Sequence, residues 1–174
     1  MKQMPCKELK TRILVVMGVS GSGKTTIGKA LAEALGWSFI EGDQFHSKEN
    51  VEKMANGVPL TDEDRAAWLD SLRKEIENHL TSGNTAVLAC SALKADYREK
   101  LKVDNRVQFV FLNIPFGVAK ERVSNRKGHF MPASLLKSQF ETLQQPEGDD
   151  SINVDAQQTP DLIVKEVVAK LQAE

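Results

Sequence analysis

A stretch near the amino terminus has the residue types and spacing of a phosphate-binding loop. Residues 18–25 read GVSGSGKT and match the pattern GxxxxGK[ST]. Glycines let the backbone curl so that its amides point at phosphate oxygens, and a following helix adds a partial positive charge. In such a loop the lysine bridges the β- and γ-phosphates of a nucleoside triphosphate, and the next hydroxyl ligates Mg²⁺. The predicted ATP-binding residues here are Gly18, Val19, Ser20, Gly21, Ser22, Gly23, Lys24, Thr25 and Thr26, with Thr25 also the predicted metal ligand.

The sequence on either side supplies the strand and helix that such a loop requires. Residues 13–17 form a short, β-branched apolar run, typical of a buried parallel strand. Apolar residues at three- and four-residue spacing over residues 27–35 predict a helix, which Gly36 is placed to end. These flanks favour a nucleotide-binding loop over the alternative of a flexible glycine turn.

Strand and helix patterns alternate along the rest of the chain. Further strands are predicted at residues 37–40, 85–90, 107–114 and 151–155. Thr61 and Asp64 resemble a capping box before a long amphipathic helix whose apolar stripe runs from Trp68 to Leu80. We therefore expect a three-layer α/β P-loop NTPase fold, with a five-stranded parallel sheet, helices on both faces and a small lid. One domain is expected over residues 1–174, with an N-terminal extension at 1–11 and a lid region at about 122–132.

Composition excludes several classes of partner. The 23 basic and 24 acidic side chains leave a net charge of -1, which gives no overall field to hold nucleic acid. No apolar run is long enough to predict a membrane span. The two cysteines, Cys6 and Cys90, are far apart and indicate neither a disulfide framework nor a zinc site. We expect a cytoplasmic protein.

Asp43 is the candidate for the acid that meets a phosphoryl acceptor. The sequence Glu41-Gly42-Asp43 follows the predicted strand 37–40, at the sheet edge where the phosphate loop also lies. The strand at 85–90 ends in Cys90-Ser91, so it supplies no acid of its own. An aspartate at this edge can orient or deprotonate a hydroxyl, an effect worth about 10²–10⁴-fold. Alternatively, Asp43 caps a helix beginning near His46; Glu41 is interpreted as structural or solvated.

Arg122 and Arg126 are candidates for a clamp on the reacting phosphates. They are four residues apart in a predicted helix, so they share one face of it. Arginines that reach a transferring phosphoryl group contribute about 10³–10⁵ in rate. The alternative is a solvated basic helix end, which the helix dipole favours.

Taken together, these segments resemble the gluconokinases of the P-loop type, relatives of shikimate kinase and of the nucleoside monophosphate kinases. The resemblance extends from about residue 13 to the last predicted helix. Its blocks are MGVSGSGK (17–24), GDxxH (42–46), NxxKMxxGxPLxDxDR (50–65), CSALKxxYR (90–98), RKGHF (126–130) and QFETLQxP (139–146). Phosphate loops are widespread, whereas the later blocks in this order are much more specific.

The resemblance implies a typically homodimeric cytoplasmic enzyme that uses ATP and Mg²⁺ to phosphorylate D-gluconate at its 6-hydroxyl. It places Asp43 at the acidic position that meets this hydroxyl, and Arg122 and Arg126 in a lid that closes over ATP. Lys24, Asp43 and Arg126 are then the predicted catalytic residues. Closure of the lid would exclude water, which otherwise competes as acceptor.

An anionic sugar acid needs fixed donors to orient its carboxylate and hydroxyls. The family blocks contain six polar or basic residues of this kind, and Arg65 and Lys94 are the preferred anion contacts. Each of them alone is equally well explained as a surface charge. His46 is expected to bind substrate or to position Asp43, because no second metal ligand accompanies it. The predicted substrate-binding set is Asp43, His46, Lys53, Arg65, Lys94, Arg98 and His129.

Two alternatives stay open at this point. One is a kinase of the same fold that acts on another small hydroxylated acid, such as shikimate, or on a nucleoside. The other is a nucleotide-responsive binding module without turnover, which would leave Asp43 without a role.

Overall fold

The computed structural model describes residues 9–126, 132–148 and 151–174. Within these ranges strands and helices alternate. The strands are β1 (Ile13–Met17), β2 (Ser38–Glu41), β3 (Ala86–Ala89), β4 (Val107–Asn113) and β5 (Ser151–Asp155). The helices are α1 (Lys24–Leu35), α2 (Lys48–Ala55), α3 (Asp62–Thr81), α4 (Ala95–Leu101), α5 (Phe116–Ser124), α6 (Ala133–Thr142) and α7 (Pro160–Gln172), and a short 3-10 helix η1 (Gly42–Phe45) follows β2.

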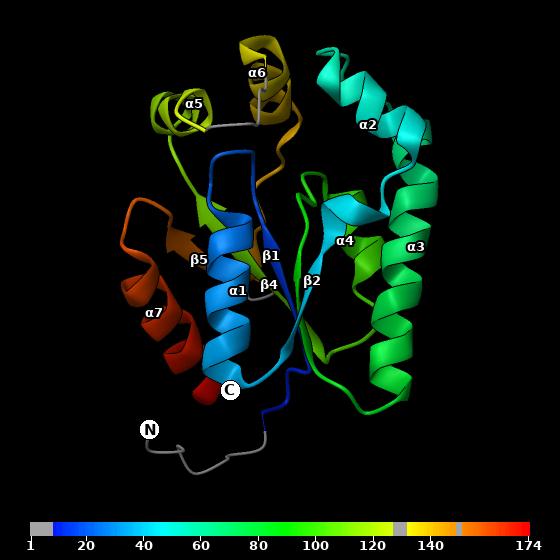
Figure 1. The fold of residues 1–174 in the computed structure, drawn as a ribbon. Coiled ribbons are helices and arrows are strands. Elements are labelled where there is room, and N and C mark those ends of the chain that lie inside the picture. The colour runs from blue at the N-terminus through cyan, green and yellow to red at the C-terminus, as the bar shows by residue number, and fades with distance from the viewer. Residues whose placement is uncertain (1–8, 127–131, 149–150) are drawn as a thin grey trace.

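The strands form one parallel, five-stranded sheet in the order β2-β3-β1-β4-β5. The central strand is β1, where Ile13 pairs with Ala86 of β3 on one side and with Val107 of β4 on the other. Because the strands are parallel, their carboxyl ends lie along one edge, at the top of Figure 1. The loops that follow β1, β2 and β3 meet at this edge, and the predicted fold class is confirmed.

Helices cover both faces of the sheet. Figure 1 shows α1 and α7 on one face and α3 with α4 on the other. Consecutive residues of β1 alternate between these layers: Leu14 lies in the apolar cluster of Leu31 in α1, and Val15 in that of Leu72 in α3. All four side chains are fully buried. Both faces of β1 are therefore anchored in a core, which gives the loop after it a rigid support.

The long helix α3 begins as predicted with a capping box. The Thr61 hydroxyl accepts a hydrogen bond of 3.1 Å from the Asp64 N–H, and the Asp64 carboxylate accepts one of 3.0 Å from the Thr61 N–H. A cap of this kind typically stabilises a helix by about 1 kcal/mol. The predicted apolar stripe of this helix is buried: Trp68, Leu69, Leu72, Ile76 and Leu80.

Some predicted boundaries differ from the structure. Helix α5 ends at Ser124 with Asn125 as its C-cap, so Arg126 lies beyond the helix and does not share a helical face with Arg122. Residues 127–131 and 1–8 lie outside the described residues, so the extents of the lid and of the N-terminal extension stay predictions. None of the described helices combines the length and the apolar character needed to cross a bilayer.

Candidate active site

The phosphate loop joins β1 to α1 and has a backbone shape that depends on its glycines. Gly21 has a φ of 84°, and a Cβ at this position would lie 2.7 Å from the carbonyl oxygen of Ala119 in α5. Gly23 has a φ of 96° and passes directly into α1, its carbonyl accepting the first helical bond from Ile27 at 2.9 Å. The loop therefore turns sharply into the start of α1, where unpaired helix amides favour an anion.

Lys24 is the first residue of α1, and its ammonium group lies back along the loop. Its Nζ donates a hydrogen bond of 3.0 Å to the carbonyl oxygen of Val19. Burial lowers the pKa of Lys24, the nearby carboxylate of Asp43 raises it, and the guanidinium of Arg126 lowers it. Asp43 and Arg126, which are far apart in the sequence, thus both lie within electrostatic reach of Lys24. The fold brings the three residues predicted to be catalytic to one region.

Thr25, the predicted metal ligand, contacts an unexpected carboxylate. Its Oγ1 donates a hydrogen bond of 2.6 Å to Oε2 of Glu41, the last residue of β2. This bond is compatible with the predicted structural role of Glu41, and it also places the carboxylate at the hydroxyl that would meet the metal. Within the described part of the chain no group of three or more His, Cys, Asp or Glu side chains could hold a metal ion. Any Mg²⁺ here would complete its shell with phosphate oxygens and water, as Mg²⁺ commonly does.

Asp43 lies in η1, directly beyond the end of β2. The preceding residue, Gly42, packs so closely on β3 that a Cβ would come 2.4 Å from the carbonyl oxygen of Ala89. This contact fixes where the chain turns. The helix-capping alternative for Asp43 is wrong, because Ser47 caps α2 by accepting a hydrogen bond of 3.1 Å from the Asn50 N–H. The Asp43 side chain is exposed at the strand-end edge.

His46 is held as a neutral ring beside Asp43. It stacks on Trp68 with ring centroids 4.2 Å apart, and the Trp68 Nε1 donates a hydrogen bond of 2.8 Å to the Gly42 carbonyl. Burial lowers the pKa of His46, with Asp43 acting in the opposite direction. The Asn50 amide nitrogen lies 3.4 Å from Nδ1. Since an amide nitrogen only donates, this contact favours the tautomer of His46 that carries its proton on Nε2 and leaves that N–H for another acceptor.

Arg65 and Lys94, the preferred anion contacts, meet around a tyrosine that the sequence prediction did not include. Arg65 Nη1 donates to the Tyr97 hydroxyl at 3.2 Å, and both cationic groups lie over the Tyr97 ring, each 5.6 Å from its centroid. Lys94 Nζ also donates to Asp62 at 2.7 Å, and the Tyr97 hydroxyl donates to the same carboxylate oxygen. The structure thus brings the two predicted anion contacts together around Tyr97, and Lys94 is already paired with the carboxylate of Asp62.

Lys53 and Arg98 have partners within the protein. Lys53 forms an ion pair of 2.8 Å with Asp64, the capping residue of α3. Arg98 is buried, and its guanidinium donates to the carbonyl oxygens of Ala92, Leu93 and Gln144 at 2.9, 3.2 and 2.7 Å. These bonds give Arg98 a structural part in shaping the loop after β3, and they do not favour the predicted substrate contact. His129 lies outside the described residues.

Arg122 and Arg126 border a small cavity on the far side of the phosphate loop from α2. Arg122 donates to the carbonyl oxygens of Gly21 and Ala156 at 3.3 and 3.0 Å, and so ties the phosphate loop to the loop after β5. The cavity has a volume of about 240 Å³. Its lining combines loop residues, both arginines and the start of α7: Gly21, Ser22, Gly23, Thr26, Ile27, Arg122, Arg126, Ala156, Gln158, Pro160 and Ile163.

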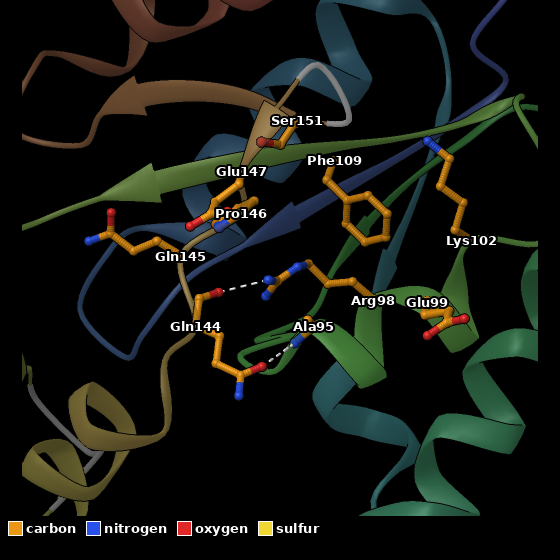
Figure 2. Close-up of a pocket in the computed structure, with 10 residues that line it drawn as sticks. All are labelled: Ala95, Arg98, Glu99, Lys102, Phe109, Gln144, Gln145, Pro146, Glu147 and Ser151. Atoms are coloured by element: carbon orange, nitrogen blue, oxygen red, sulfur yellow. Dashed lines mark hydrogen bonds between the residues drawn. The ribbon is translucent and has the colours of Figure 1, made fainter.

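Another hollow, of about 560 Å³, lies away from the phosphate loop. Figure 2 shows it between α4, β4 and the segment that follows α6, with Arg98 and Gln144 in its wall. Of the predicted site residues that the structure describes, only Arg98 lines it, and that guanidinium is already bound to main-chain carbonyls. The predicted chemistry therefore does not belong to this hollow.

Four residues that contact the predicted site residues were not predicted to belong to the site: Glu41, Asp62, Tyr97 and Gln139. Glu41 carried a signal, since it is an acid at the end of a strand. Asp62, Tyr97 and Gln139 lie inside the family blocks, and this position was the only signal in the sequence that they could belong to the site. Gln139 contacts Ser20 of the phosphate loop, 119 residues away, a partner that only the fold reveals.

Comparison with known proteins shows the family of this chain. Residues 20–172 match the shikimate kinase family. A gluconokinase of Gluconobacter oxydans (strain 621H) is 50% identical over 169 residues, spanning 95% of this chain and 94% of the relative. A solved gluconokinase from Sinorhizobium meliloti 1021 has a TM-score of 0.85 at 46% identity and covers 95% of this chain and 94% of its own. A solved sugar kinase from Janibacter sp. HTCC2649 has a TM-score of 0.87 at 46% identity, with coverages of 93% and 95%.

The parallel sheet, the glycine-dependent loop and the position of Lys24 define a P-loop kinase. The chain belongs to the shikimate kinase family of P-loop kinases, in the branch formed by the gluconokinases. The resemblance seen in the sequence blocks is thereby confirmed.

Proposed function

We propose that the protein transfers the γ-phosphoryl group of ATP to the 6-hydroxyl of D-gluconate, giving ADP and 6-phospho-D-gluconate. The choice of acceptor is supported by the gluconokinase relatives, one of which is 50% identical over 95% of this chain. The observation that carries the chemistry is the position of Asp43, an exposed carboxylate within electrostatic reach of Lys24 at the strand-end edge. A carboxylate beside the lysine that meets the phosphates is where an acceptor hydroxyl has to be aimed.

In the proposed reaction Asp43 holds the 6-hydroxyl in line with the γ-phosphorus and takes up its proton. A bond forms between the hydroxyl oxygen and phosphorus while the bond to the oxygen bridging the β- and γ-phosphates breaks, and ADP leaves with that electron pair. Lys24 and Arg126 offset the negative charge that spreads over the transferring group. The neighbouring Nε2–H of His46 donates to a substrate hydroxyl and restricts its rotation.

The proposed path of ATP crosses the phosphate loop. Its phosphates lie on the main-chain amides at the end of the loop and the start of α1, and its base enters the cavity of about 240 Å³ beyond them. Ile27 and Ile163 give this cavity apolar walls suited to a ring system. Arg122 is held by two main-chain carbonyls and shapes the cavity, whereas Arg126 lies close enough to Lys24 to act on phosphate.

Mg²⁺ fits the side chains at the edge between α1 and β2. The Thr25 hydroxyl, the Glu41 carboxylate and the nearby Asp43 supply hard oxygen donors, the kind that Mg²⁺ prefers. Thr25 would ligate the ion directly and Glu41 would hold one of its waters. When bound, Mg²⁺ neutralises charge on the β- and γ-phosphates.

The proposed acceptor site lies between η1, α3 and the loop after β3. Arg65 and Lys94 bind the gluconate carboxylate, and the Tyr97 hydroxyl, held between them, contacts it as well. Lys53 contributes to the acceptor site only indirectly, because its ammonium group is paired with the carboxylate of Asp64. Asp43 and His46 meet the other end of the sugar acid. Gluconate would thus span the distance between an anion clamp and a catalytic carboxylate.

A homodimer and a cytoplasmic location are proposed on the family resemblance alone. Size-exclusion chromatography with multi-angle light scattering measures the mass of the particle in solution. A particle of twice the chain mass of 19.3 kDa supports the dimer, and one of the chain mass contradicts it.

A panel of acceptors tests the function. The protein is incubated with ATP, Mg²⁺ and, in separate reactions, gluconate, other sugar acids, shikimate and nucleosides, and ADP release is measured. We expect a gluconate-dependent rate far above the ATPase background. A larger rate with shikimate or a nucleoside would favour the related kinases, and ATP binding without any acceptor-dependent ADP release would favour the binding module.

A further inference from the structure

The side chain of Gln139, on α6, holds the phosphate loop from outside. Its Oε1 accepts a hydrogen bond of 2.8 Å from the Ser20 N–H, and its Nε2 donates to the Ser20 hydroxyl at 3.4 Å. Ser20 lies in the middle of the loop whose main-chain amides are used to bind phosphate. One part of the nucleotide site is therefore fixed by a side chain on another element, half-buried against it.

The chain that follows Gln139 is fixed at the acceptor side. Gln144 comes just after α6; its N–H donates to the Leu93 carbonyl at 2.8 Å, and its Oε1 accepts a bond of 2.8 Å from the Ala95 N–H. Arg98 adds a bond of 2.7 Å to the Gln144 carbonyl, and Figure 2 shows this bond and the one to Ala95. These contacts attach the end of α6 to both sides of Lys94 in the chain, the predicted anion contact.

A direct bond closes this arrangement into a ring. The N–H of Gly18, at the start of the phosphate loop, donates to the carbonyl oxygen of Ser91 at 3.2 Å. The next residue, Ala92, has a φ of 44°, a left-handed conformation that is unfavourable for a non-glycine residue. Arg98 binds its carbonyl oxygen and helps to hold it there. The loop after β3 is thus a strained segment whose shape depends on its contacts with the phosphate loop and with α6.

We propose that Gln139 is a positioning residue that couples the phosphate loop to the loop between β3 and α4, so that nucleotide binding orders the acceptor side. A nucleotide that fixes the phosphate loop also fixes Ser20, and through it Gln139, Gln144 and the segment around Lys94. An acceptor that binds afterwards loses less conformational freedom, and its affinity rises. By linkage, the acceptor raises the affinity for nucleotide by the same factor. The acceptor part rests on the proposed function, whereas the part that concerns ordering by nucleotide does not.

Hydrogen exchange tests the ordering without any acceptor. A non-hydrolysable ATP analogue is added at saturation to the wild type, to Gln139→Ala and to Gln145→Ala. Gln145 is the matched control because it is an exposed glutamine of the same segment whose side chain takes part in none of the described hydrogen bonds. The analogue should slow exchange at the amide of Ala95 several-fold in the wild type and the control, and leave it unchanged in Gln139→Ala. Equal slowing in all three proteins would overturn the proposal.

A conservative variant separates positioning from folding. Gln139→Glu keeps an acceptor for the Ser20 N–H and places a negative charge beside the phosphates. It should bind the analogue more weakly yet still slow exchange at Ala95 once saturated. Loss of the slowing in Gln139→Glu despite saturation would show that the accepted bond is not the coupling contact, and would overturn the proposal.

Gluconate affinity with and without the analogue measures the coupling itself. We expect the analogue to lower the gluconate Kd by roughly fivefold or more in the wild type and in Gln145→Ala, and to leave it nearly unchanged in Gln139→Ala. The same factor in Gln139→Ala would overturn the acceptor part. Failure of every variant to bind gluconate would count against the proposed function, and the exchange at Ala95 would still decide the role of Gln139.

Discussion

The hydroxyl of Thr25 and the carboxylate of Glu41 are joined by a hydrogen bond of 2.6 Å between the first turn of α1 and the end of β2. Thr25 belongs to the sequence motif and Glu41 does not. Their contact places two oxygen donors, the Thr25 hydroxyl and the Glu41 carboxylate, where the phosphates of ATP are proposed to lie. Glu41 is thus suited to hold a water of the metal ion.

Glu41→Gln should weaken the binding of Mg²⁺ without changing the nucleotide loop. Removing a group that orients a metal-bound ligand typically costs about 10- to 100-fold in metal affinity or activity. We expect the Mg²⁺ concentration for half-maximal activity to rise by about tenfold, with metal-free ATP affinity unchanged. Titrating activity with Mg²⁺ at fixed ATP measures this. The control is Glu33→Gln, an exposed glutamate on α1, and identical curves for the two variants would contradict the role of Glu41.

The two arginines around the nucleotide cavity should differ when each is replaced by alanine. Arg122→Ala loses two bonds to main-chain carbonyls, so we expect a higher KM for ATP and a loss of about 1–2 kcal/mol in the free energy of unfolding. Arg126→Ala loses a charge near the transferring group, so kcat should fall by about 10³. Steady-state kinetics and thermal denaturation distinguish the two. An Arg126→Ala effect confined to stability would support a role at the helix end only.

Asp62→Asn should improve gluconate binding. Asp62 accepts hydrogen bonds from Lys94 and Tyr97, and these partners, together with the neighbouring Lys94 charge, hold its pKa below the usual range. The Asp62 carboxylate therefore competes with the substrate carboxylate for the ammonium group of Lys94. Since an exposed ion pair contributes little, the KM for gluconate should fall by no more than about fivefold, with kcat unchanged.

Asp70→Asn is the matched control for this variant, because Asp70 lies on the same helix as Asp62. Its carboxylate forms an ion pair of 2.5 Å with Lys100 of α4, away from the proposed acceptor site. Its KM should equal that of the wild type. A higher KM in Asp62→Asn would mean that Asp62 is needed to place Lys94 and Tyr97, and would contradict competition with substrate.

Contacts between charged side chains that are distant in the sequence could not be predicted from the sequence alone. The phosphate loop, the strand ends and the capping box at Thr61 were predictable because they depend on neighbours in the chain. The bond from Asp62 to Lys94 and the three carbonyl contacts of Arg98 join segments distant in sequence. Arg98 was predicted to contact substrate because it is basic and lies in a family block. Only the fold shows that its guanidinium donates to main-chain carbonyls. For the same reason the sequence did not show that Glu41, two residues before Asp43, contacts Thr25.

Asp64 should make stability depend on pH. Hydrogen bonds from Lys53 and from the Thr61 N–H lower the pKa of Asp64 from 3.8 to about 2. The folded state thus releases this proton more readily than the unfolded state. The stabilisation is fully present above the unfolded value and is lost as the pH falls toward the folded value of about 2.

Asp64→Asn should therefore have a lower urea midpoint at neutral pH and a shallower decline as the medium is acidified from about pH 5 to about pH 3. Glu63→Gln, at the adjacent position of α3, should keep the slope of the wild type. Equal slopes for wild type and Asp64→Asn would show that this carboxylate does not contribute.

The central claim is that Asp43 aims and deprotonates the acceptor hydroxyl. Its most direct test is Asp43→Asn, with Gln44→Ala, the next residue of η1, as control. Single-turnover rates with gluconate and the Kd for ATP are measured on both. We predict a fall in rate of about 10²–10⁴ for Asp43→Asn with ATP affinity preserved within about twofold, and a wild-type rate for Gln44→Ala. A wild-type rate in Asp43→Asn would contradict the mechanism.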